Sequence, residues 1–108
     1  MTKDEMVQLG ANIEFTGFDA MHGDELITVK KIVGNHIRRL EELSNHFDGL
    51  KLRVKPLHKT EAEAKKFEIH ATLMDGGKTY PASVIEHNLF AGVDSVLKKI
   101  VNELGHSA

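Results

Sequence analysis

Three basic residues alternate along one short segment of this 108-residue chain. Lys51, Arg53 and Lys55 are separated by apolar residues within "LKLRVKPL". In a β-strand this spacing places all three side chains on the same face. Three like charges on one strand face repel each other unless an anion neutralises them. The pattern therefore indicates a surface that binds a polyanion such as a nucleic acid.

Other basic residues occupy the polar sides of two segments with helical periodicity. In the first, Lys31 and Arg38 lie opposite the apolar stripe and Arg39 lies on its flank. In the second, Lys98 points outward and Lys99 lies on the flank. Such residues can bind phosphates, or they can serve solubility alone, which the acidic residues of the same segments favour. The candidate RNA-binding residues are Lys31, Arg38, Arg39, Lys51, Arg53, Lys55, Lys98 and Lys99.

The adjacent lysines of the last segment are not equivalent. Lys98 follows Asp94 by one helical turn, and an i, i+4 ion pair of about 0.3 to 0.5 kcal/mol would neutralise it. Lys99 lies on the flank of the helix and can reach a partner while its neighbour Ile100 stays buried. We therefore expect Lys99 to be the stronger contact.

Catalytic and metal-binding patterns are lacking in the sequence. The chain has no Ser, His and acid set and no glycine-flanked serine on a strand-to-helix turn. Its seven histidines follow no metal-ligand spacing, and it has no cysteine. The "DGGK" stretch lacks the spacing of a phosphate loop and precedes a strand. We expect a protein that is not an enzyme and that uses no cofactor, metal or small-molecule substrate.

Length and composition favour one domain without a membrane segment. A chain of this length, 41% hydrophobic and 28% charged, suits one globular domain. No apolar run approaches the roughly 18 to 20 residues that cross a bilayer, and the start lacks the apolar core of a signal peptide. The lack of cysteine fits a reducing cytosol. We therefore expect a cytoplasmic protein, with residues 1–11 as a loose N-terminal segment and 12–108 as the domain.

Hydrophobic periodicity predicts the order strand, helix, three strands, helix. The strands are expected in "NIEFTGF", "LKLRVKPL", "FEIHATL" and "TYPASVI", and the last two are joined by a hairpin turn at Asp75, Gly76 and Gly77. In the first strand, Ile13 should face one side and Phe18 the other. Pro56 should close the central part of the second strand. The helices are expected from Asp24 to about Ser44, and from an Asn88 cap to a stop at Gly105.

These elements predict an α+β fold with two layers. The first two strands should pair in parallel because a helix links them, and the later neighbours should be antiparallel. Both helices must cover one face of the four-stranded mixed sheet, as in double-stranded-RNA-binding domains. The opposite face, with Lys51, Arg53, Lys55 and His70, is left to solvent or to a partner.

The chain resembles a known protein family in the order of the expected strands and helices and in two stretches, "RLEELSNHFDGLKLRVK" and "NLFAGVDSVLKKIVNEL". That family is the ribosome hibernation-promoting factor and ribosome-associated inhibitor family. The family has a Leu-Glu pair near the end of its first helix, and then Phe-Asp before its second strand. Its last helix opens with an acidic or amide residue, an aromatic, small residues, an aliphatic and Asp, and continues to a Lys. The matching residues are Leu40, Glu41, Phe47, Asp48, Asn88, Phe90, Ala91, Gly92, Val93, Asp94 and Lys99.

This resemblance covers about residues 12–104 and implies a short, single-domain member of the family. Such a member binds ribosomal RNA of the small subunit in the channel for messenger and transfer RNA, and it keeps idle ribosomes silent. The basic residues would contact phosphates. The free protein is expected to be monomeric. The alternative is a protein-interaction or general RNA-binding module that uses the exposed sheet face.

Overall fold

The structure is a computed structural model that describes residues 12–18, 23–57 and 66–107. The expected loose segment 1–11 lies outside these residues. The elements follow the predicted order: β1 (Ile13–Thr16), α2 (Gly23–Leu43), β2 (Phe47–Leu57), β3 (Lys66–Asp75), β4 (Lys78–Glu86) and α3 (Leu89–Ser107).

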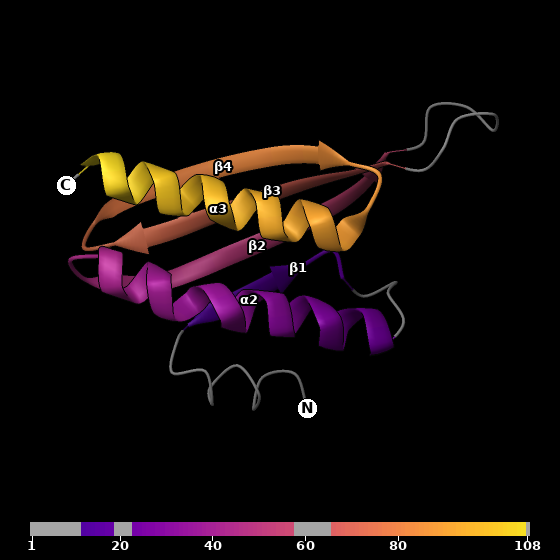
Figure 1. Ribbon diagram of the computed structural model, residues 1–108, viewed down its shortest axis with the longest axis horizontal. Coiled ribbons are helices and arrows are strands. Elements are labelled where there is room, and N and C mark those ends of the chain that lie inside the picture. The colour runs from indigo at the N-terminus through magenta and orange to yellow at the C-terminus, as the bar shows by residue number, and fades with distance from the viewer. Residues whose placement is uncertain (1–11, 19–22, 58–65, 108) are drawn as a thin grey trace.

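The sheet has the strand order β1-β2-β3-β4. β1 and β2 are parallel, whereas β2 with β3 and β3 with β4 are antiparallel. Figure 1 shows α2 and α3 side by side over one face of this sheet. The predicted two-layer α+β fold is confirmed.

The core lies between the helices and the covered face of the sheet. Along β2, buried Leu50, Leu52 and Val54 alternate with exposed residues, as the sequence predicts. β3 contributes Ile69 and Leu73, which are fully buried. Burying a side chain of this size stabilises the fold by about 1.5 to 3 kcal/mol. The helices supply the matching stripes, Val29, Val33, Ile37 and Leu40 from α2 and Leu89, Val93, Val96, Leu97, Ile100 and Leu104 from α3.

Gly92 allows α3 to approach the sheet closely. A methyl group at this position would collide with Ile69 Cδ1 and lie 3.2 Å from Glu86 Cβ. The end of the Ile69 side chain would have to move, and Glu86 would have to give way by a few tenths of an ångström.

The end of β1 differs from the prediction. The strand stops at Thr16, and Gly17 adopts a φ of +85°. A side chain at Gly17 would collide with the carbonyl oxygen of Val54. This turn breaks the alternation, so Phe18 is buried instead of facing outward, and its ring packs edge to face on Phe15 at 5.3 Å.

One other expected boundary is wrong, because α3 continues through Gly105 to Ser107 rather than stopping there. β2 ends at Leu57, as the expected strand does, although it begins earlier, at Phe47. Pro56 lies within β2 and pairs with Phe67. β1 pairs with β2 only as far as Arg53, so β2 is an edge strand at Pro56 and loses no ladder hydrogen bond there. The Asn88 cap is confirmed, because its Oδ1 accepts a hydrogen bond from Ala91 N at 3.0 Å.

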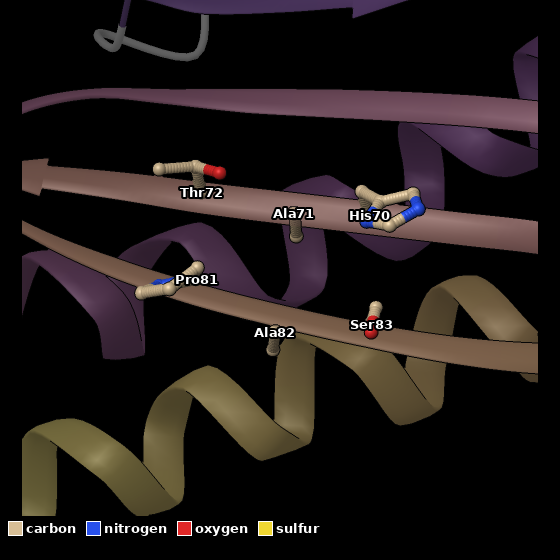
Figure 2. A pocket seen from close by; sticks show the side chains of 6 residues that line it. All are labelled: His70, Ala71, Thr72, Pro81, Ala82 and Ser83. Carbon is tan, nitrogen blue, oxygen red and sulfur yellow. The ribbon is translucent and has the colours of Figure 1, made fainter.

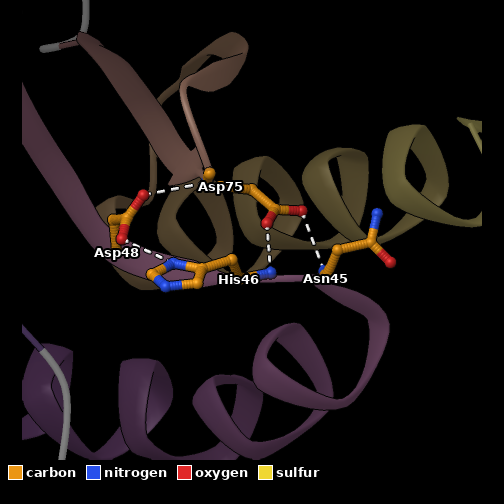
Figure 3. Close-up of polar contacts among 5 residues, drawn as sticks. Asn45, His46, Asp48 and Asp75 are labelled. Carbon is orange, nitrogen blue, oxygen red and sulfur yellow. Dashed lines mark hydrogen bonds and ion pairs between the residues drawn. The ribbon is translucent and has the colours of Figure 1, made fainter.

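Two aspartates tie the turn after α2 to the β3–β4 hairpin (Figure 3). Buried Asp75 accepts hydrogen bonds from the backbone N–H groups of Asn45 and His46. In return, Asp48 accepts one from Gly76 N at 2.8 Å, and its other oxygen lies 2.8 Å from His46 Nδ1. The hairpin itself is the predicted one, with positive φ at both of its central glycines. The two turns are thereby held in register at one end of the sheet.

We predict that Asp75→Ala lowers the free energy of unfolding by about 1 to 3 kcal/mol, because two backbone donors lose a charged acceptor. Asp48→Ala is the matched control and should cost less than about 1 kcal/mol, since this carboxylate is partly exposed to solvent. Denaturant unfolding of both variants gives the comparison. Equal losses of unfolding free energy in the two variants would mean that the burial of Asp75 adds nothing to stability.

Candidate nucleic-acid interface

Lys51, Arg53 and Lys55 project from β2 on the open face of the sheet, and all three are exposed. Their orientation is the one that the alternation predicts, because the residues between them are buried under the helices. Side chains two residues apart on a strand are separated by roughly 6.5 Å. We call these three residues the basic row.

The neighbouring strands place acidic residues beside both ends of the basic row. Glu14 on β1 pairs in register with Lys51, and their charged atoms are 3.9 Å apart. Glu68 on β3 lies opposite Lys55 and also contacts His70 at 3.2 Å. Ion pairs at exposed positions contribute at most about 1 kcal/mol, so an incoming phosphate can replace them.

Arg53, at the centre of the basic row, has different neighbours. Its register partners are Thr16 on β1 and His70 on β3. Among the residues that the structure describes, neither Arg53 nor Lys55 forms an ion pair with a carboxylate, but Lys55 lies opposite Glu68, whereas Arg53 has no acidic register partner. This guanidinium is therefore the least compensated charge of the row and the best placed to bind a phosphate in a bidentate manner.

A second basic surface lies on the outer side of the helix layer. Lys31, Arg38 and Arg39 are exposed on α2, as the helical periodicity predicts. Lys98 and Lys99 are exposed on α3. The helices that carry these five residues cover the face of the sheet opposite to the basic row (Figure 1). The fold thus separates the eight candidate residues into two groups, one on the open face of the sheet and one on the helix layer.

The two adjacent lysines of α3 reach in different directions. Lys98 Nζ lies 2.8 Å from Asp94 Oδ2, so the predicted i, i+4 ion pair is confirmed. Lys99 Nζ donates a hydrogen bond of 3.0 Å to the carbonyl oxygen of Ser83 on the edge strand β4. The partner of Lys99 in this contact is a neutral carbonyl group, whereas Lys98 is paired with a carboxylate.

Asp94 also connects the two helices. Its Oδ1 lies 2.7 Å from Nε2 of His36, a partly buried residue on α2. The hydrogen bond from Lys98, and then the one from His36, hold the pKa of Asp94 below its ordinary value. The sequence places His36 at the border of the apolar stripe, but nothing in the spacing shows that it meets a residue 58 positions later.

A shallow hollow of about 250 Å³ opens between β3 and β4 (Figure 2). It is lined by His70, Ala71, Thr72, Pro81, Ala82 and Ser83. His70 pairs with Ser83 and Thr72 with Pro81 across the two strands, while Ala71 and Ala82 pack toward the core side. The hollow therefore lies on the open face, one strand from the basic row. The alternation along β3 predicts His70 on this face, but the hollow depends on the register of β4, which the sequence does not specify.

The described residues contain no group of three or more His, Cys, Asp or Glu side chains that could hold a metal ion. Over the same part of the chain, no helix has the length and apolar character needed to cross a membrane.

Comparison with known proteins finds similar solved structures. A ribosomal subunit interface protein from Coxiella burnetii superposes with a TM-score of 0.61 at 14% identity, over 89% of this chain and 96% of that one. The N-terminal domain of Protein Y from Thermus thermophilus gives a TM-score of 0.57 at 10% identity, with the same two coverages. No protein-family model and no curated protein sequence matches the chain. The fold that the sequence resemblance implies is therefore confirmed.

We predict that Asp94→Asn lowers the free energy of unfolding at neutral pH by less than about 1 kcal/mol, because Asp94 is partly exposed. Because the pKa of Asp94 is lower in the folded protein than in the unfolded chain, its ionised form stabilises the fold at pH values above the unfolded pKa. This stabilisation disappears as the pH falls through the folded pKa. The free energies of unfolding of the wild type and the variant should therefore converge as the pH falls below about 4.

Thermal unfolding across this pH range measures the difference, and Glu42→Gln on the exposed side of α2 is the matched control. A difference between wild type and Asp94→Asn that stays constant with pH would contradict the prediction.

Proposed function

We propose that this chain is a ribosome-associated inhibitor of translation. It binds ribosomal RNA of the small subunit in the channel for messenger and transfer RNA, and it acts by occupying that channel rather than by catalysis. Its residues 12–108 act as one cytoplasmic domain that is monomeric when free.

The observation that carries the proposal is the fold shared with a ribosomal subunit interface protein over nearly the whole of both chains. The sequence motifs "RLEELSNHFDGLKLRVK" and "NLFAGVDSVLKKIVNEL" point independently to proteins of the same kind. Fold alone does not decide function, so the surface chemistry must agree with it. The exposed basic row, on a sheet face that nothing in the described chain covers, supplies that agreement.

The division of the basic residues between two surfaces favours a channel over a flat docking site. The basic row would contact RNA on one wall, and Lys31, Arg38, Arg39, Lys98 and Lys99 would contact it on the other. Lysine and arginine bound to phosphates position a protein without reading sequence. A small net charge of -2 does not oppose this, because local basic surfaces determine the attraction.

The edge strand β4 supports a monomeric free protein. Lys99 donates a hydrogen bond to the backbone carbonyl of Ser83, so this carbonyl points to the free edge of the sheet. The backbone groups of every second residue point to the same edge, so those of Pro81 do too. Proline has no N–H group to offer there. A proline and a lysine on an edge strand both disfavour pairing with a second copy.

A protein-interaction module is the alternative function. Ile85 is 57% exposed on the open face, and a protein partner could bury it. Salt dependence distinguishes the two functions, because phosphate contacts release counterions and weaken steeply as salt rises.

Sedimentation with purified ribosomal subunits tests the proposal. The protein should pellet with small subunits at low salt and leave them at about 0.5 M salt. Replacing the basic row, Lys51, Arg53 and Lys55, by Gln should weaken binding and lower the salt slope by about one for each lost phosphate contact. The matched variant with Lys31, Arg38 and Arg39 replaced by Gln removes equal charge from the opposite surface and should also weaken binding.

Lys78→Gln, at the hairpin end of β4, is the neutral control. A protein that stays unbound at every salt concentration would refute the ribosome proposal. Full binding by one of the triple variants would restrict the interface to the other surface.

We also predict that Lys99→Ala weakens binding to the small subunit by up to about tenfold, which is about 1.4 kcal/mol. Lys98→Ala should have a smaller effect, because Asp94 already compensates its charge. Neither substitution should shift the melting temperature much, since both side chains are exposed. Equal, negligible effects on binding would show that both lysines only solvate α3.

A further inference from the structure

We propose that the open face of the sheet binds an extended single strand of RNA, with phosphates on the basic row and one base in the hollow between β3 and β4. This inference rests on the proposed function and adds to it the form of RNA that the sheet face accepts.

The basic row has the geometry to bind one strand. Its three charges form a single line along β2, at intervals of roughly 6.5 Å. Glu14 lies beside one end of the line and Glu68 beside the other. A second line of phosphates next to the first would meet these carboxylates. The charge pattern therefore suits one strand in single file rather than a broad polyanionic surface.

The hollow is in register with the least compensated charge of the basic row. Arg53 pairs with His70, and His70 pairs with Ser83. Lys51 pairs with Thr72 on the other side of the hollow. Adjacent strands are about 4.8 Å apart, so the backbones of β3 and β4, which carry the hollow, lie about 5 and 10 Å from the backbone of β2. A ribose and base can span this separation from a phosphate bound at Lys51 or Arg53.

The lining of the hollow has the chemistry to hold a base. The imidazole of His70 is an aromatic ring on which a base can stack, and its contact with Glu68 directs it away from Thr72 along β3. The hydroxyl groups of Thr72 and Ser83 can donate to or accept from a base edge. Pro81 supplies an apolar surface. Figure 2 shows these side chains on the two neighbouring strands.

A duplex cannot use the hollow. Its bases are stacked and paired inside the helix, whereas an unpaired base can turn out and enter a pocket. Stacking of this kind tolerates different sequences because every base has a flat face. The sheet face should therefore select single strands with little sequence preference.

Fluorescence anisotropy tests the inference with three labelled probes of equal length. They are a mixed-sequence single-stranded oligoribonucleotide, the same strand annealed to its complement, and an abasic strand with the same phosphates. The wild-type protein should bind the single strand about tenfold or more tightly than the other two.

Ser83→Ile fills the hollow without changing the backbone carbonyl that accepts from Lys99. Thr79→Ile is the matched control, because it places the same side chain on the same strand and face but outside the hollow. Both residues are exposed, and β-branched residues suit a strand. Ser83→Ile should abolish the roughly tenfold preference for the single strand, while Thr79→Ile should retain it.

Equal binding of the single strand and the duplex would overturn the inference, as would failure to bind the single strand. Equal effects of Ser83→Ile and Thr79→Ile, or binding of the abasic strand as tight as that of the single strand, would overturn it too. Sedimentation with subunits keeps the two proposals separate. A protein that pellets with small subunits but does not prefer single strands refutes only this inference. One that prefers single strands but never pellets refutes only the proposed function.

Discussion

The structure depends on the burial of two helical apolar stripes on the same face of one sheet. Because strand side chains alternate, covering one face fixes what the other face presents. Leu50, Leu52 and Val54 lie under the helices, so the basic residues between them must point outward. The uncovered face is therefore a direct consequence of core packing. A shift of β2 by one residue would bury its charges and destroy the core at the same time.

The position of α3 determines how the second basic surface is arranged. Gly92 brings the helix close to Ile69, and the Asn88 cap fixes where it begins. With the helix so placed, Lys98 turns toward the junction with α2, where Asp94 links it to His36. The next residue, Lys99, turns toward β4 instead. Neighbouring residues of identical type thus acquire different roles from their angular positions on one helix.

Most of the fold could be predicted from the sequence, because periodicity specifies elements and their faces. The structure differs from the prediction where tertiary contacts override local sequence preferences. Gly17 takes a positive φ that returns Phe18 to the core, and Gly105 lies within the last turns of α3. The basic row could be predicted in the same way as the strands. The His36–Asp94 contact and the hollow beside His70 could not, because both depend on how distant elements align.

Occupation of the messenger RNA path is the central claim, and competition on purified small subunits tests it most directly. A labelled messenger RNA is titrated onto subunits at increasing concentrations of the protein, at constant low salt. The account predicts that the apparent dissociation constant of the messenger RNA rises in proportion to protein concentration, without a ternary complex. Simultaneous binding of both, with the affinity for messenger RNA unchanged, would contradict it.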